Sequence, residues 1–128
     1  MKRGRASYKW EFAIGTTSRV PSTYTHYLIA DFDGGTLADV FRRIQHIKGI
    51  RHVFVQKTEH GWHLYTDLML EFPKLILLLH KIGSDKTWVN IGRTRGYFFL
   101  ADKSAVILPW PVERMIIHAK EEGKERNT

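Results

Sequence analysis

The chain has 128 residues, of which 43% are hydrophobic and 26% are charged, a balance typical of one folded domain with a sizeable core. It contains no cysteine, which excludes disulfide bonds and cysteine-ligated zinc, and its formal net charge of +7 favours a polyanionic partner, nucleic acid first. No apolar run reaches transmembrane length and no signal-peptide core follows the basic start, so we expect a single-domain cytoplasmic protein without a membrane partner.

The first third of the chain predicts two strands joined by a loop. Residues 1–6 are expected to form a flexible basic arm, and apolar and polar residues then alternate over 8–14, as in a half-buried strand. A loop rich in Gly, Ser, Thr and Pro covers 15–25. The next strand, 27–33, begins with an apolar run and ends in two acids, which two glycines follow.

A helix is expected directly after that strand. Thr36 can cap its start, with Asp39 at the third helical position, and Gly49 can cap its end. Apolar residues recur at helical spacing and predict the core-facing stripe: Leu37, Val40, Phe41, Ile44 and Ile47.

The middle of the chain predicts a β-hairpin and a second helix. The hairpin strands are expected at 51–57 and 62–65, around a turn-like segment. Pro73 suits the first turn of a helix and Gly83 suits its end, so the helix is placed at 72–82.

The last third predicts strands and a closing helix. Strands are expected at 88–91 and 97–101, on either side of a Gly-Arg loop, and another at 105–110. A last amphipathic helix begins at Pro111, and the charged tail 121–128 is expected to be disordered.

This order of elements contains the pattern β-α-β-β-α-β, which is the ferredoxin-like pattern that RNA-recognition-motif (RRM) folds also use. The predicted class is therefore α+β. We expect an RRM-like or ferredoxin-like antiparallel sheet with helices packed on one face, in one domain spanning 1–128.

The first candidate site is the end of the strand at 27–33. Because strand side chains alternate between faces, Asp31 and Asp33 point the same way, and two carboxylates on one side suit a divalent cation. The alternative is a turn at Asp33-Gly34-Gly35 with Asp31 as an exposed strand residue.

The second candidate is His63, in Gly61-Trp62-His63-Leu64-Tyr65. If Trp62 and Leu64 face the helices, His63 lies on the open face of the sheet, where an imidazole can bond a phosphate oxygen. The alternative is a surface histidine in a chain that holds seven of them.

The third candidate lies between two glycines, Gly92 and Gly96. Arg93 and Arg95 can clamp phosphate, and Tyr97 begins an aromatic run that can stack on bases. A basic hairpin loop before a core strand is the alternative interpretation.

Together these stretches resemble the catalytic core of archaeo-eukaryotic primases, especially the primase-polymerases of archaeal plasmids and viruses. The family's acid-x-acid motif at a strand end is matched by Asp31-Phe32-Asp33, and its small-x-histidine motif in a hairpin strand by Gly61-Trp62-His63. The third motif, a hydrophobe followed by an acid on a later strand, corresponds to Val89-Asn90, with an amide in place of the acid. The resemblance spans about residues 25–108.

The resemblance implies catalytic roles for three residues. Asp31 and Asp33 would be ligands of Mg²⁺ or Mn²⁺, and His63 would contact the triphosphate of a nucleotide. Asn90 would be the third metal ligand, and its missing charge would weaken the metal site and with it nucleotidyl transfer.

Two hypotheses of different class follow. The first is a nucleic-acid- or nucleotide-binding protein of the primase-polymerase type, in plasmid or virus replication, with metal-dependent nucleotidyl transfer weak or lost. The second is a noncatalytic DNA- or RNA-binding module on the same type of fold. A small plasmid or viral interaction protein whose basicity is incidental is a third interpretation.

Overall fold

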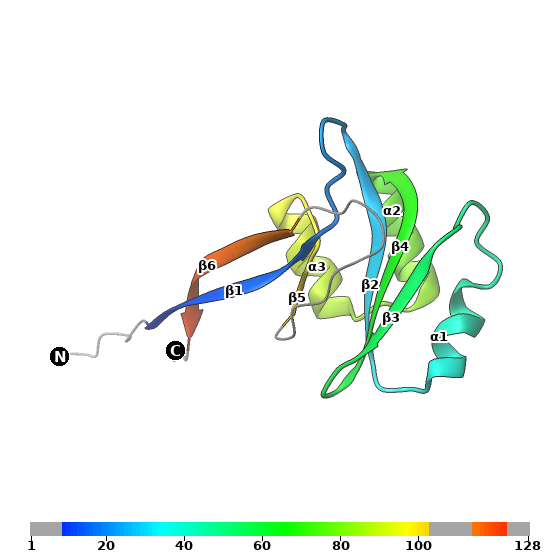
Figure 1. Ribbon diagram of the computed structural model, residues 1–128, viewed down its shortest axis with the longest axis horizontal. Helices are drawn as coiled ribbons and strands as arrows, with labels where there is room; N and C mark the ends of the chain where they lie inside the picture. Colours follow the sequence, from blue (N-terminus) through cyan, green and yellow to red (C-terminus); the bar gives the residue numbers. More distant parts are fainter. Residues whose placement is uncertain (1–8, 103–113, 123–128) are drawn as a thin grey trace.

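The structure is a computed structural model that describes residues 9–102 and 114–122. The expected basic arm at 1–6, the strand at 105–110 and the tail from residue 123 lie outside the described residues. The elements follow in the order β1 (Lys9–Thr17), β2 (Thr25–Asp33), α1 (Leu37–Ile44), β3 (Val53–Lys57), β4 (Gly61–Glu71), α2 (Phe72–Ile82), α3 (Lys86–Arg95), β5 (Phe99–Ala101) and β6 (Arg114–Glu122) (Figure 1).

The strands form two antiparallel sheets of three strands, so the predicted α+β class is confirmed and the arrangement is compatible with a ferredoxin-like one. The first sheet has the order β2-β4-β3, with the predicted hairpin of β3 and β4 on one side and β2 on the other. In the second sheet, β1 pairs with β5 and β6. Figure 1 shows β1 and β6 extending away from the β2-β4-β3 sheet.

The core lies between the β2-β4-β3 sheet and the helices α1 and α2. Its fully buried side chains include Leu28 and Ala30 of β2, Leu64 of β4, and Leu75 and Leu79 of α2. The predicted boundaries of α2 are confirmed, with Pro73 in the first turn and Gly83 in the left-handed conformation at the end (φ 80°). Burial of this apolar face anchors the sheet.

Helix α1 lies on the same face of the sheet as Phe32. The Arg43 guanidinium sits over the Phe32 ring at 5.3 Å and donates to the backbone carbonyl of Ile82 at the end of α2. The Arg43 side chain therefore links α1 to α2. This contact lies on the face of the sheet opposite to that of Asp31, because neighbouring strand residues such as Asp31 and Phe32 point to opposite faces.

The predicted stripe of α1 is only partly buried. Thr36 and Asp39 form the predicted capping box, and Val40 and Ile44 are buried. Leu37 and Phe41 are 44% and 46% exposed, however, and the helix ends at Ile44 rather than near Gly49. A helix of only eight residues meets the sheet along one ridge of i, i+4 positions, so the apolar flank beside that ridge stays open to water.

The expected strand at 88–91 and the loop after it are wrong, because Lys86–Arg95 is helix α3. The Asp85 carboxylate accepts a hydrogen bond from the Trp88 backbone amide and caps the helix start. Val89 and Gly92, three positions apart, are the buried residues of its packed face. The capping interaction and this spacing outweigh the β-propensity of the aromatic and β-branched residues.

The expected helix after Pro111 is also wrong for its described part, because Arg114–Glu122 is strand β6, paired antiparallel with β1. Met115 and Ile116 lie at helical spacing from apolar residues on either side, but Ile116 and Ile117 are β-branched and also favour strands. The pairing with β1 decides between the two, and it extends over the first residues of the expected tail, Glu121 and Glu122. No helix within the described ranges is long and apolar enough to cross a membrane.

Candidate functional site

A pocket of about 540 Å³ opens where β2 ends beside the β3-β4 turn. Asp33 at the end of β2 pairs with Gly61 at the start of β4, so the turn and both strand ends form one rim. Acids and histidines dominate the ionisable groups that line it, with one lysine: Asp31, Asp33, Lys57, Glu59, His60, His63, Asp85 and Asp102. The pocket of this basic protein is therefore acidic.

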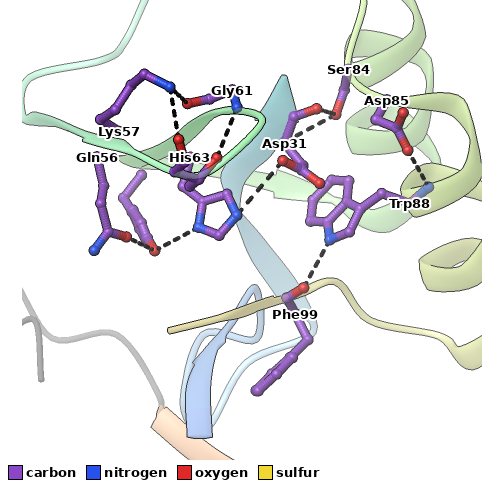
Figure 2. Close-up of polar contacts among 11 residues, drawn as sticks. Asp31, Gln56, Lys57, Gly61, His63, Ser84, Asp85, Trp88 and Phe99 are labelled. Carbon is purple, nitrogen blue, oxygen red and sulfur yellow. Dashed lines mark hydrogen bonds and ion pairs between the residues drawn. The ribbon is translucent and has the colours of Figure 1, made fainter. Parts of the chain in front are cut away.

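Asp31 and His63 face each other inside the pocket. They are register partners on β2 and β4, and Asp31 Oδ1 lies 3.6 Å from His63 Nε2 (Figure 2). The side chains are 29% and 14% exposed, so both are screened from bulk water but open to a ligand. The structure thus brings together the first two predicted motifs.

The two residues before α3, Ser84 and Asp85, are hydrogen-bonded to the backbone of Asp31. The Asp31 amide donates to the Ser84 hydroxyl, which donates to the Asp31 carbonyl, and that carbonyl also accepts the Asp85 amide at 2.7 Å. These bonds place the Asp85 carboxylate at the pocket beside Asp31. Sequence reasoning missed Asp85, although an acid directly before a helical segment is an N-cap signal.

Asp31 holds its proton more tightly than an ordinary aspartate. Burial is the largest cause that raises the pKa of the Asp31 carboxyl, the nearby carboxylates of Asp85 and Asp33 act in the same direction, and together they bring this pKa to about 6. A carboxylate in such surroundings is stabilised by any positive or proton-donating group that enters the pocket.

The pKa of the His63 imidazole is shifted in the opposite direction, downwards. Burial lowers the pKa of the His63 imidazole to about 4, although the Asp102 carboxylate favours the protonated form. The imidazole is therefore neutral at physiological pH, and one of its two nitrogens is an acceptor.

A row of polar side chains continues from His63 into the sheet. His63 Nδ1 lies 3.4 Å from the Tyr65 hydroxyl, which donates to Gln56 Oε1 at 3.1 Å. Gln56 Nε2 in turn donates to Asp102 Oδ1 at 3.2 Å. Asp102, directly after β5, is the second pocket acid that sequence reasoning missed.

Asn90 is not on a strand beside Asp31. It lies exposed on α3 and does not line the pocket. Within residues 9–102 and 114–122, no three His, Asp or Glu side chains are grouped so that they could hold a metal ion. The described donors, Asp31 and Asp33 included, therefore do not fit a preassembled metal centre.

Arg93, Arg95 and Tyr97 lie away from the pocket. The Arg95 guanidinium stacks on the Tyr97 ring at 4.5 Å, and Arg19 lies 5.4 Å from the same ring. Arg19 forms an isolated antiparallel β-bridge with His26 through the backbone. Asp31 follows His26 five positions later along the strand, which is about 17 Å at the ordinary rise per residue. Two of the predicted binding residues, Arg95 and Tyr97, thus form a second, separate cluster with Arg19, which we call the arginine-tyrosine cluster.

Comparison with known proteins identifies no relative. No protein-family model, no curated protein and no solved structure matches the chain.

Proposed function

We propose that the protein binds nucleotide or nucleic acid in the manner of the primase-polymerases, in plasmid or virus replication, with metal-dependent nucleotidyl transfer weak or lost. The observation that carries the proposal is the direct facing of Asp31 and His63 in one pocket. These residues belong to two motifs thirty residues apart, and the resemblance requires them to meet.

A third motif of the proposed family can be found at a different place from Val89-Asn90. Ala101-Asp102 is an apolar residue followed by an acid at the end of β5, and both residues line the pocket. In this interpretation the chain keeps all three motifs, and Asn90 is a surface residue of α3.

The carboxylates explain why transfer is expected to be weak. Metal ions supply charge neutralisation for phosphoryl transfer when they are bound between acids. Asp31, Asp33, Asp85 and Asp102 surround the pocket, but they are not grouped as a set of three ligands. Binding of a nucleotide is therefore the better supported activity, with a divalent cation offsetting the repulsion between the acids and the phosphates.

The noncatalytic DNA- or RNA-binding module is the second candidate. The arginine-tyrosine cluster favours it, because arginines stacked on an aromatic ring can bind phosphates while the ring stacks on a base. This cluster and the pocket can be tested separately.

A calorimetric titration with ATP and dATP, with and without Mn²⁺, tests the pocket. We expect Mn²⁺-dependent nucleotide binding in the wild type and its loss in Asp31→Asn. Asn90→Asp serves as the matched control and should bind like the wild type. If the wild type binds neither nucleotide with Mn²⁺ present, the primase-type proposal is wrong; if Asn90→Asp strengthens binding, the third motif is at Asn90 after all.

A further inference from the structure

The row of side chains beneath His63 fixes where its protons lie. A carboxylate oxygen only accepts, so the contact between Gln56 and Asp102 requires the Gln56 amide nitrogen to face Asp102. The Gln56 carbonyl oxygen then faces Tyr65 and accepts the single proton of its hydroxyl.

That proton cannot also be donated to His63. The Tyr65 oxygen therefore acts as the acceptor in the contact with His63, and Nδ1 of the imidazole carries the hydrogen. The competing arrangement would place the hydrogen on Nε2, facing Asp31. The 3.4 Å contact between Nδ1 and Tyr65 is a long hydrogen bond, whereas the 3.6 Å separation between Nε2 and Asp31 is longer still and exceeds hydrogen-bond length.

Burial strengthens this assignment. The Tyr65 side chain is fully buried, and a buried hydroxyl that fails to bond costs free energy. The orientation of the Tyr65 hydroxyl is thus set by its contacts with protein groups. Through its contact with Nδ1, Tyr65 in turn orients the mostly buried His63 imidazole.

We propose that Gln56 and Tyr65 are positioning residues that hold His63 with its hydrogen on Nδ1, so that Nε2 and the Asp31 carboxylate present two acceptors to the pocket. Two acceptors this close repel each other, and a hydroxyl or amino group placed between them bonds to both. A phosphate oxygen, which only accepts, does not suit this pair.

The ligand class follows, and this part of the inference rests on the proposed function. In a bound nucleotide, the donors of this kind are the sugar hydroxyls and the exocyclic amino group of the base, and we assign the hydroxyls to this pair. His63 would then contact the sugar rather than the phosphates, in contrast to the role implied by the family resemblance.

The tautomer is tested by ¹⁵N NMR of the His63 ring near neutral pH. In the wild type, we expect a pyrrole-type, protonated Nδ1 and a pyridine-type, unprotonated Nε2. Tyr65→Phe removes the acceptor for Nδ1, and Gln56→Leu frees the Tyr65 proton to point at Nδ1. Both variants should move the hydrogen to Nε2.

A control variant separates positioning from general disturbance. Tyr27→Phe removes a hydroxyl from another tyrosine that is nearly buried, in β2. It should keep the wild-type tautomer. A wild-type spectrum with the hydrogen on Nε2 overturns the assignment, and so does an unchanged tautomer in Gln56→Leu, a substitution at a partly exposed position.

The ligand class is tested in the same spectra with ATP and 2′,3′-dideoxy-ATP, each with Mg²⁺, at concentrations where calorimetry shows binding. ATP should shift the Nε2 resonance, and the dideoxy compound should shift it much less. Equal shifts, or bound ATP that leaves Nε2 unshifted, overturn the hydroxyl contact. Because the tautomer is read without any ligand, a protein that failed to bind nucleotides would refute the proposed function and still show whether Gln56 and Tyr65 position His63.

Discussion

Asp31 and His63 illustrate how two neighbouring side chains can have opposite effects on stability. Burial is the largest cause of both pKa shifts, with Asp85 and Asp33 also acting on Asp31 and Asp102 acting on His63. Sequence alternation placed Asp31 and Asp33 on one face and predicted His63 as a site residue. It could not supply Asp85 or Asp102, because those acids reach the pocket through contacts made after the chain folds.

The pH dependence of stability should separate the two residues. The pKa of Asp31 is raised from 3.8 to about 6, so its contribution to stability is lost as the pH rises from about 4 to 6. The pKa of His63 is lowered from 6.5 to about 4, so its contribution is lost as the pH falls through the same range. In the wild type these effects oppose each other.

Single substitutions should reveal each effect in melting temperatures measured from pH 4 to pH 6.5. Relative to the wild type, Asp31→Asn should gain stability as the pH rises, and His63→Gln should lose it. If both single variants keep the wild-type pH profile, the two side chains do not have the shifted pKa values that the pocket gives them.

At the scale of elements, the sequence predicted those whose signals are local. Pro73 and Gly83 fixed both ends of α2, and alternation or turn residues identified β1, β2 and the β3-β4 hairpin. Helix α3 and strand β6 were mistaken because their residues suit both structures. The N-cap at Asp85 favours the helix in α3, and pairing with β1 favours the strand in β6.

Gly92 offers a test of how α3 packs. In an exposed helix, Gly→Ala is worth up to about 1 kcal/mol of added stability. Here a Cβ atom on Gly92 would overlap the ring of Phe98, which is fully buried. Overpacking of this kind typically costs about 1–3 kcal/mol, so Gly92→Ala should lower the free energy of unfolding despite its better helix propensity.

Asn90→Ala is the matched control, because it lies two residues earlier on the exposed side of the same helix. It should be neutral or slightly stabilising in urea denaturation. A Gly92→Ala variant that is as stable as Asn90→Ala would contradict the packing of α3 against Phe98.

On the scale of the whole molecule, charge is divided between two regions. The chain carries a formal net charge of +7, yet the pocket is lined by five acids and one lysine. The positive charge that would attract nucleic acid therefore lies elsewhere, and the arginine-tyrosine cluster is a region where this charge meets an aromatic ring. Composition predicted the polyanionic partner but could not show that this basic surface and the acidic pocket are apart.

Binding of a labelled single-stranded oligonucleotide across a salt series should locate the basic surface. Each phosphate contact on a single strand contributes about 0.7 to the slope of log K against log salt, so removing Arg93 and Arg95 together should reduce the slope by about 1.4. Mn²⁺-dependent nucleotide binding at the pocket should remain in the same variant, because neither arginine lines it.

The matched control is Lys74→Ala with Lys81→Ala, which removes the same charge from exposed positions of α2 and should leave the slope near its wild-type value. An equal loss of slope in both double variants would mean that net charge, and not the arginine-tyrosine cluster, governs binding. Undetectable oligonucleotide binding at low salt would exclude the noncatalytic nucleic-acid-binding module.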